Sequence, residues 1–185
     1  MNGLLKIFAI KLITSERFIM FFNKKKKTIV LYYSQSLGNT KNIAEHIADL
    51  KSYDIEAIDT KNPYTGSYDE IMEQGKEEVE RGYKPIIKPF THDILSYDKI
   101  ILGSPTWWYT IAPAVASFLD EYNLSGKIVV PFVTFGGYEG HSLSDLKEGC
   151  KKAKILNAKS IQFDSENLNK MAISQEELDC WIQSI

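Results

Sequence analysis

Short apolar runs alternate with segments of helical periodicity from residue 28 to the end of the chain. The three clearest runs are TIVLYY (28–33), KIILGS (99–104) and KIVVPFVTF (127–135). They are rich in β-branched and aromatic residues and bounded by polar ones, as is typical of strands buried on both faces. Helical spacing of apolar residues follows them at 43–50, 112–122 and 142–154. Because parallel strands need crossover connections, this alternation predicts a parallel sheet with helices on both faces.

Two weaker strands and two further helices complete the pattern. We expect strands at 54–59 and 159–163, an exposed acid-rich helix at 68–81 and a final helix at 175–185. Ser174 is placed to cap the final helix, with Glu177 three residues further on. Five strands fit a doubly wound, three-layer α/β sandwich with strand order 2-1-3-4-5. Ligands of such sheets bind beyond the carboxyl ends of the strands, where the strand order reverses between strands 1 and 3.

The charge of the chain divides it into two parts. Residues 1–27 carry seven bases and one acid, a balance of +6, whereas residues 28–185 carry 15 bases and 23 acids, a balance of −8. An acidic domain of this kind disfavours nucleic acid and favours basic protein partners. The two cysteines and three histidines show no ligand spacing, so we expect neither a metal site nor a disulfide framework, and we expect a cytoplasmic protein.

The basic, apolar N-terminal extension, residues 1–27, is separate from the domain at 28–185. Its apolar stretches are interrupted by Lys6, Lys11 and the pair Glu16-Arg17. Each uninterrupted stretch is therefore too short to span a bilayer, and the segment does not fit a signal peptide. Three interpretations stay open. The true start is Met20, the segment is a loosely ordered extension, or it is a basic amphipathic anchor at a membrane surface.

The loop SQSLGNT (34–40) follows the first predicted strand and precedes a helix. Its hydroxyl and amide side chains, a glycine that permits a tight turn and the free amide groups of the helix suit a phosphate held without lysine or arginine. The alternative is an ordinary capping turn, since Ser, Asn and Thr are common caps. Neither the P-loop motif nor the dinucleotide fingerprint is present in the sequence.

Two further unusual loops follow the central strands. GSPTWWYTIAP (103–113) places three aromatic residues in a row, which suits a flat, conjugated ligand or, alternatively, a hydrophobic plug or partner surface. TFGGYEGHS (134–142) has three glycines, which allow close approach of backbone amides to a ligand or form a flexible turn.

Together these three loops resemble the flavodoxin family over residues 28–185. The resemblance implies a flavodoxin-like fold, whose strand order is the one predicted here, and FMN as the cofactor. It implies phosphate contacts from Ser34, Gln35, Ser36, Leu37, Gly38, Asn39 and Thr40. It implies ring contacts from Pro105, Thr106, Trp107 and Trp108, and pyrimidine contacts from the backbone of Thr134, Phe135, Gly136 and Gly137. The family's phosphate pattern has no counterpart of Leu37, which leaves the register of the phosphate contacts open by one position.

The resemblance implies an electron-transfer protein that shuttles electrons between redox partners, with no catalytic side chain of its own. The alternative is an FMN-dependent NAD(P)H:quinone-type oxidoreductase that reduces a small acceptor, in which His141 would relay a proton. A flavin-free receiver-type domain is disfavoured, because it needs an aspartate where the third strand ends and Gly103 to Pro105 stand there. Monomer and homodimer are both open.

Overall fold

The computed structural model describes residues 26–164, 167 and 169–185. The predicted extension at 1–27 therefore lies outside the described residues, apart from Lys26 and Lys27. The strands are β1 (Thr28–Tyr32), β2 (Asp54–Ala57), β3 (Lys99–Trp107), β4 (Thr110–Ile111), β5 (Ile128–Phe135), β6 (Lys154–Ile155) and β7 (Lys159–Gln162). The helices are α2 (Asn39–Lys51), α3 (Tyr68–Glu80), α4 (Pro113–Glu121), α5 (Ser142–Gly149) and α6 (Gln175–Ser184), with a 3₁₀ turn η1 (Ile94–Ser96).

The predicted sheet is confirmed, with two additions. The strands lie in the order β2-β1-β3-β5-β6, and all of these pairs are parallel. The fifth position is shared, because β6 pairs with the start of β5 and β7 pairs with its end. The short β4 adds an antiparallel pair to the end of β3. The helix expected at 142–154 was predicted too long, since it ends at Gly149 and residues 154–155 enter the sheet.

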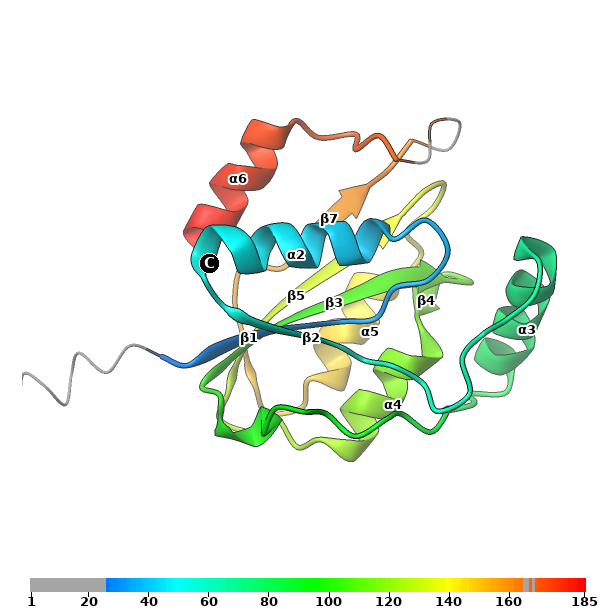
Figure 1. Cartoon of the computed structure of the whole chain (residues 1–185), viewed down its shortest axis with the longest axis horizontal. Coiled ribbons are helices and arrows are strands. Elements are labelled where there is room, and N and C mark those ends of the chain that lie inside the picture. The colour runs from blue at the N-terminus through cyan, green and yellow to red at the C-terminus, as the bar shows by residue number, and fades with distance from the viewer. Residues whose placement is uncertain (1–25, 165–166, 168) are drawn as a thin grey trace, which may run out of the picture.

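Helices cover both faces of the sheet (Figure 1). Side chains of β1 alternate between them: Ile29 and Leu31 pack toward α4 and α5, and Val30 and Tyr32 pack toward α2 and α6. Period-two alternation with two apolar faces is what a central parallel strand requires. In Figure 1, α3 stands apart from these layers, beyond the end of the sheet that β3 points toward.

Three helices begin at residues with recognisable start signals. Ser174 accepts a hydrogen bond from the backbone amide of Glu177 at 3.1 Å, which confirms the predicted cap of α6. Ser67 and Glu70 form a reciprocal capping box at the start of α3. Pro113 occupies the first turn of α4, where its missing amide hydrogen costs nothing.

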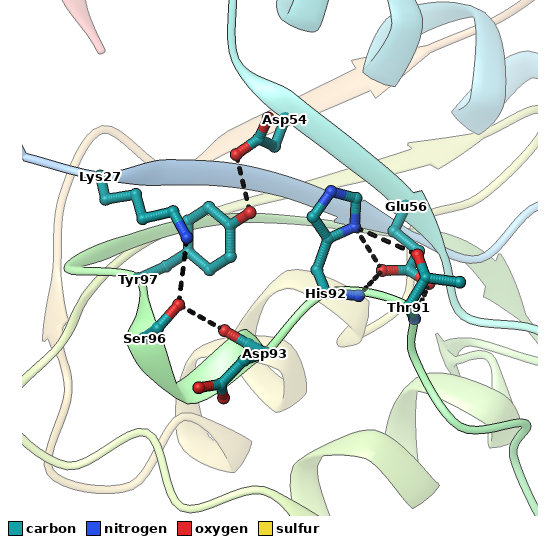
Figure 2. Close-up of polar contacts among 8 residues, drawn as sticks. All are labelled: Lys27, Asp54, Glu56, Thr91, His92, Asp93, Ser96 and Tyr97. Carbon is teal, nitrogen blue, oxygen red and sulfur yellow. Dashed lines mark hydrogen bonds and ion pairs between the residues drawn. The ribbon is translucent and has the colours of Figure 1, made fainter.

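The long connection from α3 to β3 is fastened to the edge strand β2 (Figure 2). The Glu56 carboxylate accepts hydrogen bonds from the backbone amides of Thr91 at 2.6 Å and His92 at 3.1 Å, and it lies 2.7 Å from His92 Nδ1. Two residues earlier in β2, the Tyr97 hydroxyl donates to Asp54 at 2.7 Å. These bonds hold the connection against β2, the edge strand of the sheet.

Two searches of the described residues give negative results. None of the helices in this part of the chain is long and apolar enough to cross a membrane. Within the same residues, no group of three or more His, Cys, Asp or Glu side chains is arranged to hold a metal ion.

Candidate functional site

A cavity of about 210 Å³ opens at the carboxyl edge of the sheet. It lies past the ends of β1, β3 and β5. The strand order reverses here, because β2 is added on one side of β1 and β3 on the other. This is the position at which doubly wound sheets bind ligands. The strand and loop residues that line it are Gln35, Ser36, Leu37, Asn39, Thr40, Pro105, Thr106, Trp107, Trp108, Thr134, Phe135 and Gly136, and α3 adds Tyr68, Ile71, Met72 and Gly75.

Twelve of the fifteen residues predicted to contact a cofactor line this one cavity. The exceptions are Ser34, Gly38 and Gly137. Ser34 Oγ is used inside the loop, where it accepts a hydrogen bond from the backbone amide of Lys41 at 3.3 Å. Gly38 and Gly137 flank lining residues without contributing to the wall themselves. The three loops that the sequence singled out therefore meet in space.

The first loop ends in an unusual helix start. Gly38 is the N-cap of α2, its φ is 76°, and as a glycine it offers no capping side chain. The loop closes through a 3.4 Å hydrogen bond from the Gly38 amide to the Gln35 carbonyl. The hydroxyl of Thr40 faces Thr134 instead, with 2.7 Å between the two Oγ1 atoms. The N-cap itself supplies no side chain, but Ser34 Oγ accepts from the amide of Lys41 in the first turn, so the loop combines one capping contact with a glycine at the helix start.

The second loop is shorter than the sequence indicated. β3 continues to Trp107 and pairs with β4 through a turn whose two central residues, Trp108 and Tyr109, have φ values of 47° and 69°. Positive φ is costly for bulky residues, so other contacts must stabilise the turn. Trp108 Nε1 donates to the Met72 carbonyl at 2.9 Å, which ties the turn to α3.

The two tryptophans, although adjacent in sequence, have different roles. Trp107 is a half-buried wall residue, packed edge-on against Tyr33 and Tyr64 with ring centroids 5.7 and 5.0 Å away. Trp108 lies at the rim, about a third of its surface exposed, with Lys76 Nζ 5.5 Å from its ring centroid. Tyr109 does not line the cavity and contacts Tyr138 at 5.8 Å between centroids.

The third loop packs against the second. His141 donates its backbone amide to the Tyr109 carbonyl at 2.7 Å. Gly140 has a φ of 64°, and a Cβ atom there would lie 2.3 Å from the same carbonyl oxygen. Glycine is therefore required at this close approach for both backbone conformation and space. Further along, Gln162 donates to the Gly136 carbonyl at 3.2 Å and holds the loop to β7.

Helix α3 forms a wall that the sequence analysis missed. Its lining residues are spaced at i, i+3, i+4 and i+7 from Tyr68, which places them on one helical face. That spacing was visible in the sequence, but we expected an exposed acid-rich helix. The helix does include many acids, and all of them are exposed except Glu78, which is buried on the same side as the lining residues.

The wall of the cavity is electrically neutral. None of its sixteen residues, all within the described part of the chain, carries an ionisable acid or base other than a tyrosine. Behind Trp107, the buried carboxylate of Glu78 accepts hydrogen bonds from Tyr64 at 2.5 Å and from Gln74 at 2.8 Å. Burial, together with the hydrogen bond to Glu78, raises the pKa of Tyr64, so its hydroxyl stays protonated and donates.

His141 lies beside the cavity rather than in its wall. Its Nδ1 contacts the Asp145 carboxylate, to which the Thr110 hydroxyl also donates. The His141 side chain is 63% exposed, so its other ring nitrogen is accessible from solvent.

A sheet with this strand order defines a doubly wound α/β domain, with a neutral, partly aromatic cavity at its switch point. A family model described as flavodoxin matches residues 27–185. The chain belongs to the flavodoxin family. The comparison with curated proteins finds no match.

Solved structures support the same assignment. The chain is 26% identical to a protein assigned as a flavoprotein from Bacteroides eggerthii DSM 20697, covering 87% of this chain and 98% of that one with a TM-score of 0.68. It is 25% identical to a flavoprotein in complex with FMN from Lactobacillus acidophilus NCFM, covering 85% and 99% with a TM-score of 0.64. Oxidised flavodoxin 1 from Bacillus cereus shares the fold, at 19% identity, 85% and 93% coverage and a TM-score of 0.52.

Proposed function

We propose that this protein binds FMN in the cavity at the carboxyl edge of the sheet and transfers electrons between redox partners. The observation that carries the proposal is the meeting of three separate loops in one neutral, partly aromatic cavity beside a helix start whose N-cap is a glycine. The flavoprotein from Lactobacillus acidophilus, a relative over nearly its whole length, was solved in complex with FMN.

The phosphate of FMN would lie in the first loop. The first turn of α2 contains no acidic residue and its N-cap is a glycine, so the amide groups that Ser34 does not occupy can meet an anion. Ser36, Asn39 and Thr40 supply polar side chains at the cavity wall. Ser34 would support the loop from behind through its bond to Lys41. Neutral donors suit a phosphate in this fold because the helix dipole supplies the positive field.

The ring of FMN would lie between the second loop, the third loop and α3. Pro105, Thr106 and Trp107 offer one wall, and Tyr68 and Met72 offer another. The backbone of Thr134 to Gly137 would bond the polar edge of the ring, with Gln162 fixing the Gly136 carbonyl. The bound flavin supplies the redox chemistry, and these residues orient it and exclude water.

The net charge of the domain favours electron transfer with protein partners. Residues 28–185 carry a balance of −8, and such a surface steers basic partners and repels the phosphates of a nicotinamide dinucleotide. One observation favours the alternative, an FMN-dependent NAD(P)H:quinone-type oxidoreductase. His141, held by Asp145 beside the cavity, is placed to donate a proton to a small acceptor. We place the protein in the cytoplasm, as a monomer or homodimer.

The test is an FMN titration followed by stepwise anaerobic reduction. Binding should quench flavin fluorescence, because aromatic side chains line the cavity. Uptake of electrons in two separate one-electron steps would support the carrier, and uptake in one two-electron step would favour the oxidoreductase. If the purified protein leaves FMN fluorescence unchanged, both functions are rejected.

A further inference from the structure

Charge is segregated between the two edges of the sheet. We define the amino-edge face as the segments that lead into the strands, residues 26–27, 51–54, 93–99, 123–128 and 150–155. This face contains eight lysines and three aspartates, a balance of +5. The other described residues contain nine bases and 19 acids, a balance of −10. A strongly acidic molecule therefore has one basic end, opposite the cavity.

The lysines of this face are not neutralised. Among the described residues, none of the eight forms an ion pair, whereas five of the nine other bases do, namely Lys41, Arg81, Lys84, Lys88 and Lys159. The amino-edge lysines contact uncharged groups instead. Lys27 Nζ bonds the Ser96 hydroxyl at 3.2 Å and lies over the Tyr97 ring (Figure 2), and Lys127 Nζ bonds two backbone carbonyls.

Several of these charges lie close to one another. Burial, followed by the like charges of Lys51 and Lys26, lowers the pKa of Lys99. Lys26, Lys127 and Lys154 line one open hollow of this face, together with Asp98 and the polar residues Ser96 and Ser125. Three lysines against one aspartate leave the hollow with a positive balance, which suits an anionic group such as a phosphate. The concentration of unpaired cations has a cost in mutual repulsion, which an anionic partner would relieve.

The chain leads into this face from a segment with matching chemistry. The described chain begins at Lys26, and β1 enters the sheet on the side opposite α3 (Figure 1). The 25 residues before Lys26 lie outside the described part of the chain. Their sequence contains 13 Leu, Ile, Met or Phe residues and five bases against one acid. Apolar residues beside a run of lysines are typical of attachment to an anionic membrane surface.

We propose that the amino-edge face docks on an anionic lipid bilayer. A nucleic acid would offer the same phosphates, but it gives no place to the apolar residues that precede Lys26. The nine residues of β3 span about 30 Å between the two edges. A domain docked in this way presents its cavity to the aqueous side, away from the lipid. The proposal does not depend on FMN binding.

The test measures binding of the full chain to vesicles of phosphatidylcholine alone and of phosphatidylcholine mixed with phosphatidylglycerol. Each lysine near an anionic surface contributes about a fivefold change in affinity. The triple variant Lys26→Gln, Lys151→Gln, Lys154→Gln should thus bind the anionic vesicles about a hundredfold more weakly. The matched control, Lys41→Gln, Lys61→Gln, Lys170→Gln, removes the same charge from exposed positions outside the face and should bind like the wild type.

The expected result is salt-sensitive binding to the anionic vesicles that only the amino-edge variant loses. Equal loss in both triple variants would overturn the proposal, because net charge and not this face would then decide binding. Binding that does not distinguish the two kinds of vesicle, or no binding to either, would also overturn it. Capture by single-stranded RNA without capture by vesicles would assign the face to nucleic acid.

Discussion

The Oγ1 atoms of Thr40 and Thr134 lie 2.7 Å apart, and this buried contact joins the first turn of α2 to the end of β5 inside the cavity wall. Each hydroxyl is the polar partner of the other in a place with little solvent. The contact sets how closely the first and third loops approach, and so shapes the space between them.

Thr134→Val should therefore destabilise the apoprotein by about 1–3 kcal/mol, because the Thr40 hydroxyl loses its partner while it stays buried. Urea denaturation measures the change. The double variant Thr40→Val, Thr134→Val removes both polar groups and should recover most of the loss. A double variant at least as unstable as the sum of the singles would show that the hydroxyl pair does not matter.

Gly75→Ala tests the wall made by α3 and Trp107. A Cβ atom at Gly75 would lie 3.0 Å from Trp107 Cε3, so the indole must move toward the cavity. We expect FMN affinity to fall about tenfold. The folding stability should change less, because the better helix propensity of alanine offsets part of the packing cost. Fluorescence titration measures the affinity. Glu73→Ala, at an exposed position on the same helix, is the control and should leave FMN affinity unchanged.

Gly38→Ala tests the phosphate loop. The φ of 76° at Gly38 disfavours alanine, although the nearest atom to an added Cβ is 4.0 Å away, so the cost of about 1–2 kcal/mol is conformational. A relaxed loop should weaken FMN binding and leave riboflavin, which lacks the phosphate, almost unaffected. The ratio of the two dissociation constants is the measurement. Equal losses for both ligands would place the phosphate elsewhere.

Glu56→Gln tests the bonds that hold the α3–β3 connection to the edge strand. Partial burial opposes ionisation of Glu56, but the hydrogen bonds from Thr91 and His92 together outweigh it and lower the pKa. Because the pKa of Glu56 is lower in the folded protein than in the unfolded chain, its ionised carboxylate stabilises the fold. This stabilisation is fully present above the unfolded-state pKa and is lost as the pH falls through the folded-state pKa. The variant should lose about 1–3 kcal/mol near pH 7.

The pH dependence separates this effect from a simple packing defect. The stability difference between wild type and Glu56→Gln should shrink as the pH falls below about 4, the region where free glutamate protonates. Denaturation at a series of pH values measures it. Asp59→Asn, which removes a carboxylate that is 62% exposed and paired with Lys88, should change stability by less than about 1 kcal/mol. If the stability difference between wild type and Glu56→Gln did not change with pH, the ionised Glu56 carboxylate would not be the source of the stabilisation.

Local pattern was sufficient to predict most of the fold. The strands around Leu31, Leu102 and Val130, the cap at Ser174 and the three ligand loops were all visible, because the period of a strand or helix depends only on residues that are neighbours in sequence. The parallel order followed from alternation, since few topologies satisfy it. The end of α5 at Gly149 and the shared fifth strand position depended on packing against β5, and these were missed.

What the tertiary structure decided was which faces meet. Trp107 and Trp108 are identical neighbours in the sequence, but the turn between β3 and β4 buries one against Gly75 and leaves the other at the rim. The face of α3 at Tyr68 has a helical spacing that sequence displays, yet only the fold brings it over the cavity. Lys26 and Lys154 are separated by most of the chain and line one hollow because parallel strands begin at the same edge. The sequence by itself determined the elements through short-range periodicity, and long-range packing alone determined the walls of the cavity and the basic face.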